Sequence, residues 1–290
     1  MPLDLAMTVM SAMEFVLWAA LGFLFWKKGL QERFPAIHIY LILRLSSMPV
    51  LLGLLYVYSQ PWGHQYFPLY FYPYWAVYIA SAITLFFVTL EIFRSVLSSF
   101  SGLMRLGTVV YRWVALVSAV ASLGFVTYTH PGVSLIPEVA LALMRSVSIL
   151  ELCLLAFICL CMNALQLSFK DLAVGFGLAL GLMSANDLIF VALETANPSL
   201  TAPLQFGYEG GILIALGTWI AYCALPERVR KPVVMPANST IYRWNEIASA
   251  LGHGTKVAVR QPANGFFLTD VERVVEKVLT RNLQSESSKS

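Results

Sequence analysis

Charged side chains are scarce in this chain of 290 residues. Asp, Glu, Lys and Arg together make up 12% of the sequence, whereas hydrophobic residues make up 58%. A water-soluble domain carries about a quarter charged residues, which coat its surface. The composition therefore excludes an ordinary soluble globule and favours a chain that lies mostly within lipid.

Motifs that carry chemistry are also missing. The sequence has no P-loop, no HExxH or GxSxG motif and no pair of CxxC clusters. Its four cysteines all fall inside apolar segments, which excludes an extracellular disulfide framework. We therefore predict no catalytic residue, cofactor, metal ligand or nucleic-acid partner, and enzymatic activity is disfavoured.

Long apolar runs are what the chain does contain. About 20 apolar residues cross the roughly 30 Å hydrocarbon core of a bilayer as a helix. Turn-forming or charged residues, such as Lys27-Lys28 and Pro226, mark the breaks between runs of this length. We predict an all-α, polytopic bundle of seven transmembrane helices at 5–26, 36–58, 70–93, 107–129, 138–163, 171–193 and 208–225.

Basic residues fall on one side of this arrangement. Four segments that would face the other side contain no Lys or Arg: 1–4, 59–69, 130–137 and 194–207. The basic residues near the ends of the spans are Lys27, Lys28, Arg33, Arg94, Arg105, Arg112, Lys170, Arg228, Arg230 and Lys231. Because cytoplasmic loops are enriched in Lys and Arg, we expect a multi-pass inner (plasma) membrane protein with its N-terminus outside and its C-terminus inside.

Aromatic rings crowd the outer ends of the second and third predicted helices. Tyr and Trp favour the headgroup level of a bilayer, so an interfacial belt is one interpretation. A stacking platform for a ligand at the outer face is the other. Both interpretations depend on Tyr70, Tyr72, Tyr74 and Trp75.

Five ionisable residues fall within the predicted spans: Glu14, Arg44, Arg145, Glu151 and Asp187. Each costs at least about 2.5–3.5 kcal/mol at the bilayer centre unless it is paired or hydrated. Two interpretations stay open. The charges form buried clamps that fix the register of the helices, or they line a polar cavity for a ligand or ion.

Depth within the bilayer predicts how these charges pair. With a helical rise of about 1.5 Å per residue, Arg145 and Asp187 lie about 10 Å and 9 Å below the outer edge. The sequence therefore predicts a buried Arg145–Asp187 pair on consecutive helices, with Arg44 within reach of Glu14 or Glu151. Near the inner edge, Glu91 and Arg94 are one turn apart and are expected to pair.

Small residues predict close helix packing and a repeat. Gly177 and Gly181 form a GxxxG pattern that lets two helices approach closely. Glu14 precedes Phe34-Pro35 much as Glu151 precedes Phe169-Lys170, which suggests parallel three-helix repeats around a single fourth helix. Some small transporters are built in this way, although chance similarity among apolar helices is the competing explanation.

The composition changes at Pro226, where a cytoplasmic tail begins. We divide the chain into a transmembrane domain, 1–225, and a tail, 226–290, with short amphipathic helices at 240–251 and 269–283 and a disordered end from Ser285. The basic run of Arg228, Arg230 and Lys231 would lie against anionic headgroups. The tail has little apolar content, so we expect it to pack on the membrane domain or on a protein partner.

Two sequence patterns resemble a family. The run Tyr70-Phe-Tyr-Pro-Tyr-Trp75 opens a helix that ends with Glu91-Ile-Phe-Arg94, and the tail contains Trp244-Asn245-Glu246 and Val271-Glu-Arg-Val-Val-Glu276. These patterns are similar to those of uncharacterised bacterial seven-helix membrane proteins. The resemblance covers most of the chain and implies an all-helical inner-membrane protein, but it brings no activity, cofactor or ligand.

Two functional hypotheses follow. The first is a non-enzymatic sensor or subunit of a complex, which receives a signal at the aromatic outer face and engages a partner through the tail. The alternative is a small-solute or ion transporter that works through Arg44, Glu14 and Glu151. The bilayer is the predicted partner in both, and no ligand is assigned.

Overall fold

The computed structural model describes residues 2–59, 67–124, 135–163, 165, 167–196, 201–225 and 240–252. These residues form eight α-helices, and no strand occurs among them. The helices are α1 (Pro2–Lys27), α2 (Pro35–Ser59), α3 (Phe67–Val96), α4 (Ser101–Gly124), α5 (Leu135–Cys161), α6 (Leu172–Ala196), α7 (Thr201–Ala224) and α8 (Thr240–Gly252). The all-α prediction is confirmed for the described part of the chain.

Six of these helices, α1 to α6, are long and apolar enough to cross a membrane. They fit a multi-pass membrane protein. The 24-residue α7 corresponds to the seventh predicted span, but it is not among the six, and Glu209 with its neighbours Gly207, Gly210 and Gly211 lowers its mean hydropathy.

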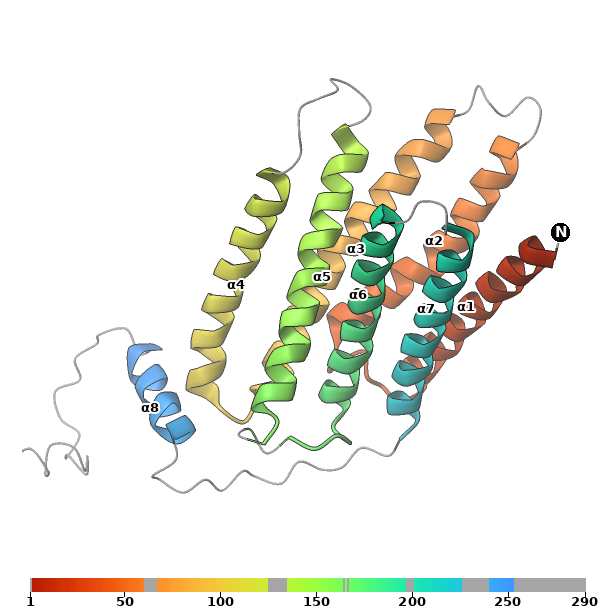
Figure 1. Cartoon of the computed structure of the whole chain (residues 1–290). Coiled ribbons are helices and arrows are strands. Elements are labelled where there is room, and N and C mark those ends of the chain that lie inside the picture. The colour runs from red at the N-terminus through yellow and green to blue at the C-terminus, as the bar shows by residue number, and fades with distance from the viewer. Residues whose placement is uncertain are drawn as a thin grey trace, which may run out of the picture. The chain divides into compact units, whose positions relative to one another are not determined.

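Six helices form a closed ring. In the order α1, α2, α3, α5, α6, α7, each helix contacts the next, and α7 contacts α1 again. Helix α4 lies outside this ring against α5 and, over a smaller area, α3. Successive helices alternate in direction, so α2, α4 and α6 end where α3, α5 and α7 begin, which we call the upper end of the bundle (Figure 1).

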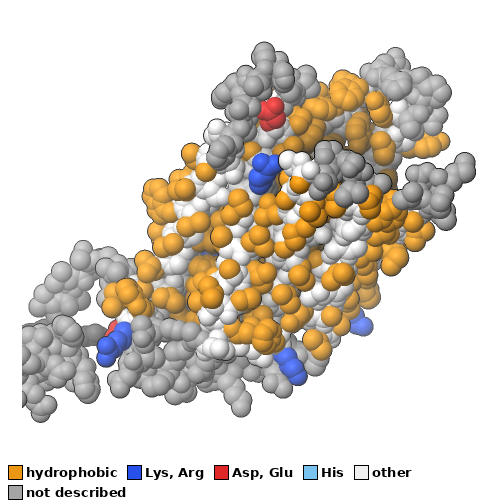
Figure 2. All heavy atoms as spheres, viewed as in Figure 1, with side chains coloured by type: hydrophobic (Ala, Val, Ile, Leu, Met, Phe, Trp, Pro, Cys, Tyr) orange, Lys and Arg blue, Asp and Glu red, His pale blue; other side chains and the backbone are white. Residues whose placement is uncertain are grey.

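The surface of the bundle is apolar. Hydrophobic side chains cover most of the face seen in Figure 2, and the few charged groups lie near its margins. Large exposed hydrophobic residues occur on every helix of the ring and on α4, among them Val16, Leu52, Ile83, Val117, Leu160, Ile189 and Ile214. Soluble monomers rarely expose contiguous apolar patches above a few hundred Å². This surface suits the interior of a lipid bilayer.

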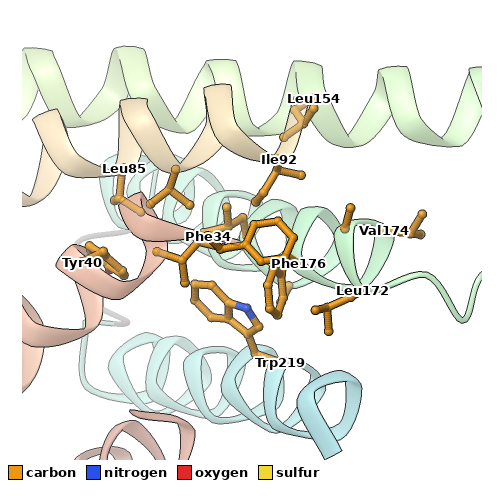
Figure 3. Close-up of a cluster of buried hydrophobic side chains, with 14 of the residues drawn as sticks. Phe34, Tyr40, Leu85, Ile92, Leu154, Leu172, Val174, Phe176 and Trp219 are labelled. Atoms are coloured by element: carbon orange, nitrogen blue, oxygen red, sulfur yellow. The ribbon is translucent and has the colours of Figure 1, made fainter. Parts of the chain in front are cut away.

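Aromatic side chains fill the lower half of the ring. Trp18, Phe34, Phe176 and Trp219 are fully buried. Phe34 packs edge-on against Phe176 at 5.2 Å between ring centroids, and Phe176 packs against Trp219 at 5.8 Å (Figure 3). Trp18, Phe176 and Trp219 come from α1, α6 and α7, and Phe34 directly precedes α2, so these side chains pack the four helices together at this end of the ring.

Two helix ends are capped by side chains from other helices. Glu91 on α3 accepts hydrogen bonds from the backbone N–H groups of Ala36 and Ile37, at 3.1 Å and 3.2 Å, which otherwise lack partners in the first turn of α2. The predicted pairing of Glu91 with Arg94 is therefore replaced by a helix cap. Lys28 donates to the carbonyls of Ala224 and Leu225 at the end of α7, at 3.2 Å and 2.8 Å.

The start of α4 differs from the prediction. The sequence placed this span at 107–129, but the helix begins at Ser101. Asn245 on α8 explains the earlier start, because its Oδ1 accepts hydrogen bonds of 3.1 Å from the backbone N–H groups of both Gly102 and Leu103. A Cβ at position 102 would collide with the backbone of α8, so the docking also requires glycine there. Helix α8 thus belongs to the same compact unit as the bundle, Met1–Gly252.

The predicted close packing at the GxxxG pattern is confirmed. A Cβ at Gly181 would collide with Leu155, and one at Gly177 would collide with Ile158. Both clashing residues lie on α5, so the two glycines bring α6 close to α5. This approach lets side chains from the two helices meet farther along.

Candidate functional site

A cavity of about 400 Å³ lies among five helices of the ring: α2, α3, α5, α6 and α7. It occupies the middle of the ring and extends toward the upper end, where it reaches Glu194, two residues before α6 ends. The fully buried side chains of Phe34, Phe176 and Trp219 (Figure 3) are not part of its lining. Its polar lining consists of Tyr40, Arg44, Tyr78, Ser81, Arg145, Ser148, Glu151, Asp187, Glu194 and Tyr208.

Four of the five predicted intramembrane charges line this cavity. They are Arg44, Arg145, Glu151 and Asp187. Glu14 lies outside the lining, where the indole Nε1 of Trp18 donates to its Oε1 at 3.0 Å. Arg44 lies over the Trp18 ring at 5.8 Å and interacts electrostatically with Glu14. Glu14, Trp18 and Arg44 therefore form a connected group beside the cavity.

Glu151 is the most deeply buried charged residue in the lining, with an exposed fraction of 4%. Its Oε2 accepts a hydrogen bond from the Ser184 hydroxyl of α6, across the glycine-mediated contact between α5 and α6. Its Oε1 is buried and has no hydrogen-bond partner in the protein. No cation is among the groups that act on this carboxyl, which are Ser184 and Asp187.

A second buried group without a partner faces the same space. Ser81 on α3 is 2% exposed, lines the cavity, and its hydroxyl oxygen has no hydrogen-bond partner. Buried polar atoms in proteins are almost always hydrogen-bonded, and an exception calls for a water, ion or ligand. The Nε of Arg44 on α2 is likewise buried without a partner, so the cavity offers unused hydrogen-bonding capacity on three of its walls, α2, α3 and α5.

Arg145 and Asp187 do not form the ion pair that the sequence predicts. Both residues line the cavity, but the side chain of Arg145 is exposed and no ion pair joins it to Asp187. The groups that act on the Asp187 carboxyl are Tyr208 of α7 and Arg44 of α2. The prediction matched depths along neighbouring helices, whereas the pairing depends on which way each helix face is turned, and α6 turns Asp187 toward α2 and α7.

Several lining residues carry no signal in the sequence. Tyr40, Tyr78 and Tyr208 come from three different helices, and Ser81 and Ser148 from two. Tyrosine and serine are ordinary constituents of membrane helices, so neither type identifies a site until the helices are placed. The sequence could identify lining residues only by their charge within an apolar span, and the charged residues that it identified in the lining lie on α2, α5 and α6.

The aromatic face is connected to the cavity by a ladder of tyrosines. Tyr58 stacks on Tyr70 at 6.0 Å between centroids, Tyr70 on Tyr74 at 5.8 Å, and Tyr74 on Tyr78 at 6.4 Å. Tyr78 is itself a lining residue. Trp75 packs against both Tyr74 and Tyr78, at 5.1 Å and 5.6 Å. The ladder joins the upper ends of α2 and α3 to the cavity.

The remaining predicted site residues divide into two groups. Tyr72 is 54% exposed and packs edge-on against Phe71, apart from the ladder, as expected for a residue of a lipid-facing belt. The basic run of Arg228, Arg230 and Lys231 lies outside the described residues, as do the predicted helix at 269–283 and the end from Ser285.

Arg112 lies in a different position from the one that the sequence predicts. Because α4 begins at Ser101, this arginine lies about 16 Å along the helix rather than at its inner end. Its side chain is exposed and lines an apolar groove of about 340 Å³ between α3, α4 and α5. The sequence placed Arg112 near the inner end of its span, because the predicted span starts six residues after Ser101.

The side chains that line the cavity are suited to binding a small polar molecule. Among the described residues, no group of three or more His, Cys, Asp and Glu side chains could hold a metal ion. The four cysteines also lie outside the cavity lining. The lining instead combines carboxyls, guanidiniums, hydroxyls and aromatic rings, which can orient a small polar molecule.

Comparison with known proteins adds no relative. No protein-family model, no curated protein and no solved structure matches the chain.

Proposed function

We propose that the protein is a non-enzymatic sensor of the inner (plasma) membrane, which binds a small polar ligand in the cavity and reports it through its C-terminal tail. The observation that carries this proposal is Glu151, a buried carboxyl with one oxygen free of protein partners, in a cavity of about 400 Å³. Small-molecule sites have volumes of about 300–1,000 Å³ and a few convergent polar groups. A packed structural clamp would leave neither the space nor the free oxygen.

The proposal includes seven membrane crossings, with the N-terminus outside and the tail inside. The Lys28 contacts with Ala224 and Leu225 support the seventh crossing, because α1 and α7 then finish at the same end of the bundle. Trp219 on α7 is also fully buried in the ring core. Lys27, Lys28 and Arg94 lie at that same lower end, which the distribution of basic residues assigns to the cytoplasm.

The output of this sensor is the docked helix α8. The cavity-lining helix α5 packs against α4, where the Ser118 hydroxyl reaches the Ser146 carbonyl at 3.5 Å. The first turn of α4 is in turn capped by Asn245 of α8. A shift of α5 on ligand binding would therefore reach the tail through a single intervening helix. The tail would then expose or withdraw a surface for a protein partner, with Arg228, Arg230 and Lys231 against anionic headgroups.

The order of the ring favours a second candidate, a small-solute transporter. Helices α1, α2 and α3 would form one repeat, and α5, α6 and α7 the other. In the ring, the last helix of each repeat contacts the first helix of the other, as the α3–α5 and α7–α1 contacts show. Two parallel three-helix repeats with α4 outside would have this arrangement. Transport would require the aromatic core around Phe176 to open, because those side chains are fully buried below the cavity.

The ligand itself provides the test. The full chain is purified in mild detergent from its own membranes, and bound small molecules are identified by native mass spectrometry. We expect a bound species with the wild type that is lost with Glu151→Gln. Glu138→Gln should retain it, because Glu138 lies on the same helix outside the cavity lining. A protein that carries no small molecule, or one that Glu151→Gln retains, contradicts the proposal.

Flux measurements separate the two candidates. In proteoliposomes, a sensor binds the identified molecule without moving it across the bilayer. A transporter accumulates it inside the vesicles, with a rate that Glu151→Gln abolishes. Membership of the uncharacterised bacterial seven-helix proteins is compatible with either outcome and belongs to the same proposal.

A further inference from the structure

We infer that the ligand of this cavity is a small organic cation whose ammonium group lies between the Glu151 carboxyl and the tyrosine rings of α2, α3 and α7. The inference rests on the proposed function, since it names the class of ligand for the same site. It follows from three observations: the balance of charge around the cavity, the aromatic lining, and the lack of a site for a metal ion.

The charge balance leaves Glu151 without a counterion. Arg44 interacts electrostatically with Glu14 and with Asp187, and it lies over the ring of Trp18. Arg145 is exposed, and it is absent from the groups that act on either carboxyl. The lining therefore holds three carboxyls, Glu151, Asp187 and Glu194, against two guanidiniums, those of Arg44 and Arg145. An uncompensated buried carboxylate is strongly destabilising, and a cationic ligand would pair with it.

Aromatic rings surround the same space. Tyr40, Tyr78, Phe190 and Tyr208 line the cavity from four different helices. An ammonium group is attracted to the face of an aromatic ring within about 6 Å, and cages of such rings recognise alkylammonium ligands. A carboxyl beside several rings is the combination that such a cage presents, and Glu151 and these rings line the same cavity.

A bare metal ion fits the cavity poorly. Hard cations take six or more oxygen ligands at about 2–2.6 Å. Among the described residues no metal-ligand cluster exists, and much of the lining is aromatic or aliphatic. A volume of about 400 Å³ leaves room for a molecule with a carbon skeleton. Its apolar part would contact Leu85, Met144 and Ile212, which also line the cavity.

The test uses defined amines and measures the thermal stability of the full chain in detergent. The probes are choline, methylammonium and phenethylammonium, and the control is 3,3-dimethyl-1-butanol, a neutral molecule with the shape of choline. A ligand that binds only the folded state raises the unfolding temperature as its concentration increases. We expect at least one amine to stabilise the protein in this way, and the neutral control to have no effect.

Variants assign the effect to the site. Glu151→Gln keeps an acceptor for Ser184 but removes the charge, and should weaken amine binding at least tenfold. Glu138→Gln should leave it unchanged. Tyr78→Phe, which keeps the ring, should retain binding, whereas Tyr78→Leu should weaken it severalfold.

Three results would overturn the inference: equal stabilisation by the neutral control, binding that survives Glu151→Gln, or no stabilisation by any amine at millimolar concentration. The proposed function fails separately. If native mass spectrometry finds an anionic or neutral molecule that depends on Glu151, the sensor proposal stands and the organic cation is wrong. If it finds no molecule at all and no amine binds, both are wrong.

Discussion

Asn245 on α8 caps the first turn of α4 by accepting a hydrogen bond from the backbone N–H of Gly102, at 3.1 Å. The same oxygen accepts a second bond from Leu103, and Gly102 leaves room for the backbone of α8 to approach. Helix ends are commonly capped by residues within four positions of them, but here the cap comes from a segment far along the chain. Formation of the start of α4 and docking of α8 are therefore one event.

Breaking this cap should release α8. Replacing an N-cap side chain by alanine costs about 1 kcal/mol, so Asn245→Ala should make opening of α8 severalfold more frequent. Gly102→Leu should release it more completely, because its side chain occupies the contact. Hydrogen–deuterium exchange of the peptide over 240–252 measures this directly. Glu246→Gln, an exposed neighbour, is the matched control and should keep wild-type protection. Unchanged exchange with Gly102→Leu would show that α8 does not dock there.

Glu91 should contribute to stability through α2 rather than through Arg94. Its carboxylate accepts from Ala36 and Ile37, and a charged cap of this kind is worth about 1–3 kcal/mol. We expect Glu91→Ala to lower the unfolding temperature in detergent by several degrees. Arg94→Gln should have a much smaller effect. An equal decrease in unfolding temperature for the two variants would favour the Glu91–Arg94 pair that the sequence predicts.

Asp187 should be coupled to Arg44 and not to Arg145. Its carboxyl interacts electrostatically with Arg44, whereas Arg145 is exposed. Two double-mutant cycles, Asp187→Asn with Arg44→Gln and Asp187→Asn with Arg145→Gln, measure the coupling from free energies of unfolding. We expect about 0.5–3 kcal/mol for the first cycle, the range for neighbours in one network, and additivity for the second. Coupling in the second cycle and additivity in the first would show that Asp187 faces Arg145 rather than Arg44.

Topology can be tested with single cysteines. The background replaces Cys153, Cys159, Cys161 and Cys223, and Gln60→Cys and Ser285→Cys are introduced one at a time. A membrane-impermeant maleimide applied to intact cells should label Gln60→Cys alone, because seven crossings place position 285 in the cytoplasm. External labelling of Ser285→Cys would show that the number of crossings or the orientation differs from the prediction. This result depends most on α7, the helix with Glu209 in its first half.

Most of the fold could be predicted from the sequence because membrane spans are specified locally. Helix-length apolar runs and their breaks placed α1, α2, α3, α5 and α6 to within a few residues. The start of α4 was missed because Asn245, the residue that caps it, lies in a later segment. The same error placed Arg112 nearer to the start of the helix than it lies. Local patterns do not report contacts of this range.

The candidate site could be predicted only in part. A charged residue within an apolar span is costly, so the sequence alone singles out candidate site residues. Four of them line one cavity: Arg44, Arg145, Glu151 and Asp187. Their pairing could not be derived, since depth along a helix says nothing about its rotation. The rings of Tyr40, Tyr78 and Tyr208 were also out of reach, because three tyrosines on three helices converge only when the ring closes. Tyr74 was selected for its place in an aromatic run, and its stacking on Tyr78 connects that run to the cavity.

The most direct test of a ligand site at Glu151 is a cryo-electron microscopy map of the full chain, extracted with its own lipids into nanodiscs and resolved well enough to place side chains. We predict compact non-protein density in the cavity, within hydrogen-bonding distance of Glu151 Oε1 and against the ring of Tyr78. A map in which the cavity is closed by repacked side chains, or in which Glu151 pairs with Arg145, would contradict the account.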